Sequence, residues 1–323
     1  MFTTHRKLLL VGLLILLVAF VFTFPLYGGA RTRILTTMLM YAILAVSWAM
    51  FSGATGYMSL APAAFLGMGV YSTALLQDYL PFPVLIVVGG LISFVLALLL
   101  GLVTLRLKGI YFTIFSFGLV VLMADVINYI EAEALGRHGW YFIYMDRATL
   151  LYTMFGLAVV TVLAAYFISR SRLGLAMRSI GGNEEAAEHM GINTTRIKVL
   201  TFAISSIFMG AAGVVLAPSL TYSNASIAFS VTNSFIPIVA AVFGGMGTLY
   251  GPMIGANVFG FLEKTLRAEW NTYFMLGFGV IMVVVIMFLP NGLAGLVPML
   301  RDKLGGVISR LQRGSEGEQH ADT

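Results

Sequence analysis

The chain consists mostly of long apolar stretches separated by short polar or glycine-rich segments. A helix needs about 20 predominantly apolar residues to cross the roughly 30 Å of a bilayer's hydrocarbon core. Helices are favoured there because every backbone polar group must be paired inside lipid, and a helix pairs its own. The pattern therefore predicts an all-α, polytopic transmembrane helical bundle with about ten spans, near residues 8–27, 34–52, 60–80, 84–105, 109–130, 150–169, 199–218, 233–248, 252–267 and 272–290.

Composition supports a membrane protein, because 59% of the 323 residues are hydrophobic and only 10% are charged. A soluble domain carries about 25% charged residues, so the partner expected for most of this surface is the lipid bilayer. The chain has no cysteine, which excludes disulfides, thiolate metal sites and cysteine nucleophiles. The net charge of +5 does not indicate a nucleic-acid partner, since the basic residues lie between apolar runs. The N-terminal apolar run is expected to be a retained first span rather than a cleaved signal peptide.

Basic residues predict the orientation, because cytoplasmic loops of membrane proteins are enriched in lysine and arginine. Arg6 and Lys7 place the N-terminus in the cytoplasm. Counting spans then places three further basic clusters inside: Arg106 with Lys108; Arg170, Arg172, Arg178, Arg196 and Lys198; and Arg301, Lys303, Arg310 and Arg313. Arg31 and Arg33 fall outside and break the rule. We expect a multi-pass protein of the bacterial inner membrane with both termini in the cytoplasm, a transmembrane domain over residues 1–290 and a partly disordered tail over residues 291–323.

Two glycine-rich segments, residues 52–62 and 244–252, interrupt the apolar pattern. Glycine permits tight turns and proline stops a helix, so both segments predict short or broken spans. In transporters such interrupted helices line the substrate path. The candidate residues for a translocation path are Gly56, Tyr57, Ser59, Pro62, Gly244, Gly245, Gly247 and Pro252. The alternative is that these glycines serve only helix–helix packing.

The loop 170–198 is the only sizeable polar stretch between predicted spans, and it contains the signals of a short helix. Asn183 is a suitable N-cap, and two glutamates follow in the first turn, where the helix dipole favours negative charge. Gly191 is placed as the left-handed residue after the helix. Such a helix can dock onto a partner through Glu184, Glu185, Ala186, Ala187 and Glu188, or it can be a solvated connector.

The pattern Glu185-Ala186-Ala187-x-x-x-Gly191 resembles the "EAA" loop of ATP-binding-cassette importer permeases. Four other motifs, at residues 56–65, 105–112, 171–174 and 244–252, resemble branched-chain amino acid permeases of the LivM type, in the order of that family. Two places depart from the family pattern. They are residues 133–140 and Tyr57, where the family usually has a small or amide-bearing residue.

The resemblance implies a permease domain whose loop docks onto a nucleotide-binding subunit, with Glu184, Glu185, Ala186, Ala187 and Gly191 as the coupling residues. It implies three kinds of partner: a second homologous permease subunit, two ATPase subunits and a periplasmic binding protein. The sequence has no phosphate-binding loop, so ATP and magnesium are expected on the ATPase subunits, and this chain is expected to carry no cofactor, catalytic residue or metal.

The substrate implied by the resemblance is a branched-chain or other hydrophobic amino acid, with urea or a short-chain amide as the alternative. A different class of function is an ion-coupled secondary transporter, which needs carboxylates at mid-depth in the membrane. The sequence offers few, with Asp125 the main candidate. A structural anchor would not need glycine-broken spans, and a membrane enzyme would need a catalytic constellation that we do not find.

Overall fold

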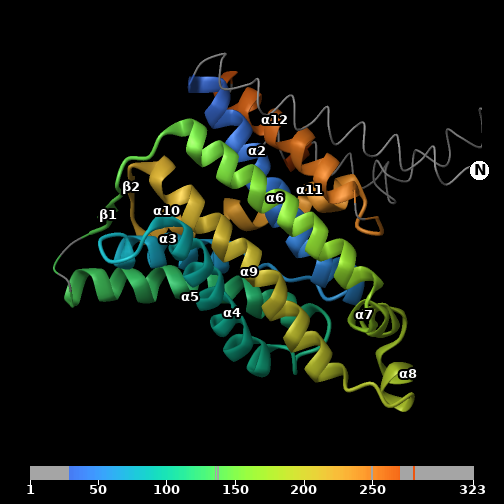
Figure 1. Cartoon of the computed structure of the whole chain (residues 1–323). Helices are drawn as coiled ribbons and strands as arrows, with labels where there is room; N and C mark the ends of the chain where they lie inside the picture. The colour runs from blue at the N-terminus through green and yellow to red at the C-terminus, as the bar shows by residue number, and fades with distance from the viewer. Residues whose placement is uncertain (1–28, 135, 137, 249, 270–278, 281–323) are drawn as a thin grey trace, which may run out of the picture.

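The computed structural model describes residues 29–134, 136, 138–248, 250–269 and 279–280 (Figure 1). Its helices are α2 (Gly29–Trp48), which continues as the π-helical turn η2 (Ala49–Gly53), α3 (Pro62–Leu76), α4 (Phe82–Thr104), α5 (Ile110–Glu133), α6 (Arg147–Arg170), α7 (Arg172–Gly182), α8 (Glu184–His189), α9 (Thr194–Leu220), α10 (Ala225–Ala228), α11 (Thr232–Gly244) and α12 (Gly251–Glu269). Two short strands, β1 (Trp140–Tyr141) and β2 (Tyr222–Ser223), pair antiparallel, with Trp140 opposite Ser223.

The prediction of a polytopic helical protein is confirmed, whereas the count of ten spans is not. Six helical stretches in the described part are long and apolar enough to cross a membrane: Thr32–Gly53, Phe82–Thr104, Ile110–Glu133, Arg147–Arg170, Thr194–Leu220 and Ala225–Gly244. The predicted first span and the tail lie outside the described residues, as does nearly all of the predicted tenth span. The small β1–β2 ladder was not predicted, since two-residue strands leave no periodic pattern.

The predicted span over residues 60–80 is wrong at both ends. Helix α3 has 15 residues, so it is about 22 Å long at 1.5 Å per residue and falls short of the hydrocarbon thickness. It begins at Pro62, a residue well suited to the first helical position because its missing N–H is not needed there. Residues 56–61 before it are not helical, and Gly56 has a φ of 76°, which glycine adopts without strain.

Helix α9 is the central element of the bundle, in contact with α4, α3, α2 and α6 (Figure 1). Its glycines permit very close approach to α3. A Cβ atom built on Gly69 would lie 1.9 Å from the carbonyl oxygen of Gly210, and one on Gly213 would lie 2.0 Å from that of Leu66. Backbones that meet this closely require small residues at the crossing, as is common where membrane helices pack.

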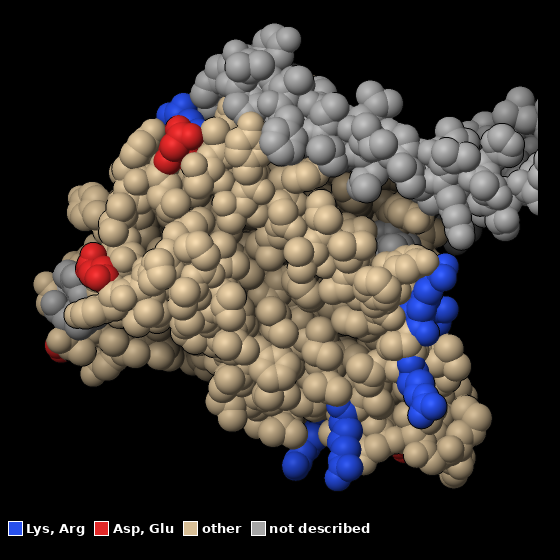
Figure 2. Space-filling view, in the orientation of Figure 1, with Lys and Arg blue, Asp and Glu red and all other residues tan. Residues whose placement is uncertain are grey.

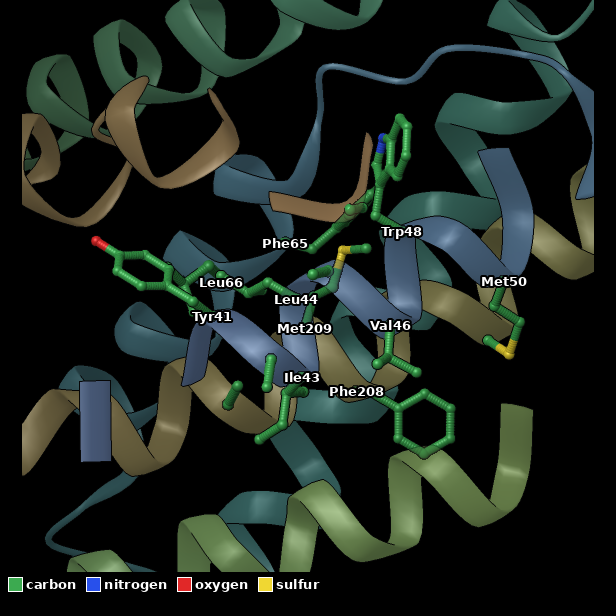
Figure 3. Packing of buried hydrophobic residues seen from close by; sticks show 14 of the residues in the cluster. Tyr41, Ile43, Leu44, Val46, Trp48, Met50, Phe65, Leu66, Phe208 and Met209 are labelled. Atoms are coloured by element: carbon green, nitrogen blue, oxygen red, sulfur yellow. The ribbon is translucent and has the colours of Figure 1, made fainter. Parts of the chain in front are cut away.

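The apolar core lies where α2, α3 and α9 meet. Leu44, Phe65, Leu66 and Met209 pack together there, each at most 3% exposed (Figure 3). The Trp48 side chain is also buried in this core, and its Nε1 donates a hydrogen bond of 2.7 Å to the carbonyl oxygen of Ser59. The core therefore holds the non-helical segment before α3 as well as the helices.

The described segments separate into two ends in agreement with the predicted topology. Arg33, which the predicted topology places outside, lines one cavity together with Tyr144 and Thr221 at the end that carries β1. Lys108 and Glu184, predicted to lie inside, line another cavity at the end that carries α8. On the face in Figure 2, the visible charged side chains lie towards the ends of the bundle and the surface between them is uncharged. We refer to these as the β1 end and the α8 end.

Replacing Gly69 with alanine should destabilise the protein, because the new methyl group would overlap the Gly210 carbonyl and force α3 and α9 apart. Overpacking of this kind costs about 1–3 kcal/mol. The matched control is Gly156→Ala in α6, where nothing lies within 4 Å of the added Cβ. The apparent melting temperature in detergent should fall for the first variant and not for the second. Equal melting temperatures would contradict the packing assignment.

Candidate functional site

Helix α8 is terminated at both ends by local hydrogen bonds, as the sequence predicts. The Oδ1 atom of Asn183 accepts a 3.0 Å hydrogen bond from the Ala186 N–H. At the other end Gly191 has a φ of 85°, and its N–H donates to the Glu188 carbonyl at 2.9 Å, while the Ile192 N–H donates to the Ala187 carbonyl at 3.1 Å. This pair of bonds is the Schellman arrangement. Asn193 then caps α9 through the Arg196 N–H at 3.0 Å.

The five predicted coupling residues do not share one environment. Glu185, Ala186 and Gly191 are exposed, as a docking surface requires. Ala187 is completely buried within the chain, so only one of the two alanines is available to a partner. Glu184 is turned inward, where its carboxylate meets side chains from two distant parts of the sequence.

Glu184, Tyr57 and Lys198 form a buried hydrogen-bonded cluster, which we call the latch. The Lys198 ammonium donates to Glu184 Oε1 at 2.6 Å and to Tyr57 Oη at 3.1 Å. The Tyr57 hydroxyl donates to the other carboxylate oxygen, Oε2. The Lys198 side chain is 3% exposed and that of Glu184 is 16% exposed. The latch joins α8 to the start of α9 and to the segment before α3.

The electrostatics of the latch favour a charged pair. Burial alone would raise the pKa of Glu184, but the hydrogen bonds from Lys198 and Tyr57 and the attraction of Lys198 lower it below its usual value. Burial and the hydrogen bond to the Glu184 carboxylate raise the pKa of Tyr57, so its phenol stays protonated and remains a donor. The lysine ammonium also lies 4.4 Å from the centre of the Tyr57 ring, within the range of a cation–π contact.

The segment 54–61 that carries Tyr57 is held by side chains from the surrounding helices. The Leu60 N–H donates to Ser116 Oγ at 2.8 Å, and the Met58 carbonyl accepts from Thr113 Oγ1 at 2.9 Å. At the start of α3 the Ala63 N–H donates to Ser234 Oγ at 2.9 Å. Non-helical backbone within a membrane bundle is tolerated where other protein groups form hydrogen bonds with its N–H and C=O groups in this way.

A cavity of about 820 Å³, which we call the apolar cavity, lies between α5, α11 and the segment 54–61. Its walls are largely aliphatic and aromatic, with Ile110 from α5 and Phe235, Val239 and Phe243 from α11 among them. Gly56, Tyr57 and Glu184 form part of its lining, so the latch borders this space. A change in the position of α8 would therefore change the shape of the cavity.

The two glycine-rich segments meet at a second cavity of about 470 Å³, the loop cavity. Gly53 and Gly56 line it from the first segment, and Gly247 and Pro252 from the second. The segments are in contact there, since a Cβ on Gly53 would lie 3.2 Å from the Met246 carbonyl oxygen. The remaining wall comes from the end of α2, from η2, and from α6 and α7.

The other candidate path residues lie at packed positions or at a helix end, outside these two cavities. Ser59 and Pro62 are buried in the core beside Trp48. A Cβ on Gly244 would lie 1.8 Å from the Gly251 carbonyl oxygen, so this glycine permits the close crossing of α11 and α12. Gly245 ends α11 with a φ of 103°. Of the eight candidates, Gly56, Tyr57, Gly247 and Pro252 line a cavity, and the path itself stays a prediction.

Sequence reasoning missed Lys198 and α7. Lys198 counted only towards orientation, although its place in the first turns of the apolar α9 is unusual for a charged residue that is 2% exposed. Helix α7 had a local signal, because the Ser171 hydroxyl caps it by accepting from the Gly174 N–H at 3.4 Å. Near its end, a Cβ on Gly181 would lie 2.5 Å from the Ala54 carbonyl oxygen, so α7 packs directly against the segment 54–61.

Comparison with known families decides the identity of the chain. Residues 30–286 match the family described as "Branched-chain amino acid transport system / permease component". The chain belongs to this permease family. The match covers both glycine-rich segments, the latch and α8, and it confirms the family suggested by the motifs.

Individual relatives agree with this assignment. The high-affinity branched-chain amino acid transport system permease protein LivM of Escherichia coli (strain K12) is 28% identical over 98% of this chain and 80% of its own length. LivH of the same organism is 33% identical over 42% of this chain and 46% of its own length. These relatives are transport permeases, which supports a transport subunit rather than an enzyme. A solved structure of PsaBC from Streptococcus pneumoniae has a TM-score of 0.47 at 16% identity, a similarity too low to support an inference.

Replacing Lys198 with methionine should destabilise the protein strongly, because the Glu184 carboxylate would keep its burial and lose its cation. Breaking one partner of a buried ion pair costs about 3–5 kcal/mol. The double variant Glu184→Gln/Lys198→Met should be more stable than Lys198→Met alone, since no unpaired charge remains. The measurement is the melting temperature of the purified membrane protein.

The matched control is Lys108→Met, an exposed lysine that lines the apolar cavity and forms no hydrogen bond with another described residue. Its charge is the smallest of the contributions that lower the pKa of Glu184. Its effect should stay within about 0.5 kcal/mol. If Lys198→Met and the double variant melt at the same temperature, the lysine and the glutamate are not coupled.

Proposed function

We propose that this chain is a membrane-embedded permease subunit of an ATP-binding-cassette importer in a bacterial inner membrane, with both termini in the cytoplasm. It pairs with a second homologous permease, and two separate ATPase subunits bind ATP and magnesium. A periplasmic binding protein delivers the substrate, a branched-chain or other hydrophobic amino acid. Family membership supports the permease role, and the similarity to permeases of branched-chain amino acid transport systems supports the substrate class.

The latch is the observation that carries the coupling mechanism. Helix α8 exposes Glu185 and Ala186 towards a partner and buries Glu184 against Lys198 and Tyr57. A displacement of α8 by an ATPase subunit is therefore transmitted through the carboxylate to the segment 54–61. That segment borders both the apolar cavity and the loop cavity. Nucleotide binding on another chain can in this way change the space available to a solute.

The competing classes have less support. An ion-coupled transporter needs a carboxylate buried at mid-depth, whereas Asp125 is exposed on α5. Glu131 is buried, but it lies in the last turn of α5 rather than at mid-depth, and its carboxylate accepts a 3.0 Å hydrogen bond from the Tyr71 hydroxyl. In the described part of the chain, no group of three or more metal-ligating side chains is present. A urea or short-amide substrate would not exploit the large apolar walls of the cavity beside Tyr57. We therefore favour the amino acid.

Replacing Glu185 with alanine should reduce substrate-stimulated ATP hydrolysis by the assembled transporter severalfold, because the substitution removes an exposed charge from the docking surface. Thermal stability should not change, since the side chain packs against nothing buried. The matched control is Glu133→Ala, an exposed glutamate at the β1 end of α5. Unchanged hydrolysis by a well-inserted Glu185→Ala transporter would remove this face of α8 from the mechanism.

Purification of the tagged chain in mild detergent, after expression with its neighbouring genes, should recover two ATPase subunits and a second permease. Proteoliposomes of that complex should import leucine only with ATP and the binding protein, and excess urea should not compete. A chain that purifies alone and transports without ATP would contradict the proposal. Import of urea without import of leucine would leave the assignment as an importer intact and would change the assigned substrate.

A further inference from the structure

The β1 end of the molecule contains a third cavity, of about 500 Å³, which we call the outer cavity. It lies between the start of α2, the start of α6, the end of α9 and the break between α10 and α11. Its volume is within the range of about 300–1,000 Å³ typical of small-molecule sites. It lies at the opposite end of the bundle from the latch, so the coupling function described above does not account for it.

Among the described residues, two arginines and no acidic residue line this cavity. Arg33 comes from α2 and Arg147 from α6, and both are exposed. Neither guanidinium forms a hydrogen bond or an ion pair with another described side chain. Guanidinium groups bind carboxylates through paired, charge-assisted hydrogen bonds. Arg33 is also one of the two arginines that break the positive-inside pattern, and a binding role explains why a cation is kept there.

The rest of the lining supplies apolar surface on one side and polar side chains on another. Met40 and Leu150, 2% and 3% exposed, contribute apolar surface together with Leu216. At the break between α10 and α11, Ser226, Ser230, Thr232 and Asn233 line the cavity, and their side chains form no hydrogen bond with any described residue. These oxygens can accept from an ammonium group.

The backbone at the cavity is also unusual. Thr221, which lines it, has a φ of 61°, and among the described residues no other non-glycine residue has a positive φ. A threonine in this conformation is strained, and strain of this kind concentrates at functional sites. Pro218 in the last turn of α9 also lines the cavity. The chain thus departs from regular helix at two places around one space.

We propose that the outer cavity binds the substrate directly as a small aliphatic amino acid. Arg33 and Arg147 bind its carboxylate, Met40, Leu150 and Leu216 contact its side chain, and the oxygens of the α10–α11 break accept from its ammonium group. This inference rests on the proposed function and adds the site at which the solute first meets the permease. It excludes urea, which has neither a carboxylate nor an aliphatic side chain.

The absence of cysteine in the chain permits a direct test. Ile227→Cys places a single thiol at an exposed position of the cavity lining that takes no part in the proposed contacts with the amino acid. In the purified complex, without ATP or binding protein, millimolar L-leucine should slow its reaction with a polar maleimide severalfold. Leucinamide, which lacks the carboxylate, should not. The protection should be lost in Ile227→Cys/Arg33→Gln/Arg147→Gln. The matched control is Asp78→Cys, an exposed position at the β1 end outside this cavity, which leucine should not protect.

Three results would contradict the proposed binding site. They are no protection by leucine, equal protection by leucine and leucinamide, and protection that survives the double arginine substitution. Loss of binding-protein capture by the double variant, with protection intact, would assign the arginines to docking instead. Leucine import by wild-type proteoliposomes is measured in parallel, so failure of the site and failure of the proposed function are distinguishable.

Discussion

The structure depends on one constraint, the pairing of backbone polar groups in the non-helical segment before α3. A helix satisfies its own backbone, but residues 56–61 cannot, and lipid offers no partners. Trp48 from α2, Thr113 and Ser116 from α5, and Ser234 from α11 supply side-chain hydrogen bonds to this stretch and to the first turn of α3. The segment is thereby fixed to three helices at once, and its position sets where Tyr57 lies.

The latch extends the same network to α8. A buried ion pair gains little net stability over apolar packing, because desolvation of the two charges offsets their attraction. The ion pair instead specifies where α8 sits, since any arrangement that separates the two partners leaves an uncompensated buried charge. Lys198 and Glu184 therefore connect α8 firmly to α9, and Tyr57 adds the connection to the cavities. The long side chain of Tyr57 is what allows the segment before α3 to reach both Glu184 and Lys198.

The glycines divide by what surrounds them. Gly69 and Gly213 bring α3 and α9 into backbone contact, Gly210 permits the close approach of α9 to Gly89 and Ser93 of α4, and Gly244 brings α11 and α12 together. Gly56 and Gly247 line cavities and have nothing within 4 Å of an added Cβ. Composition alone cannot distinguish packing glycines from cavity-lining glycines, because both roles require a residue without a side chain. They differ only in whether another helix or an open space faces the glycine.

Local interactions explain what the sequence determined by itself. Hydropathy located most of the helices, and the caps Asn183, Gly191 and Asn193 bounded α8 and the start of α9, since each acts through hydrogen bonds within a few residues. The motifs were sufficient to recognise the permease family. Tertiary structure alone decided that Glu184 faces inward, that Lys198 pairs with it, that Arg33 and Arg147 share a cavity and that α3 starts late. The contacts of Tyr57 with Glu184 and Lys198 join residues 127 and 141 positions apart. Such pairings follow from how the helices pack, and no pattern along the chain encodes the distance between them.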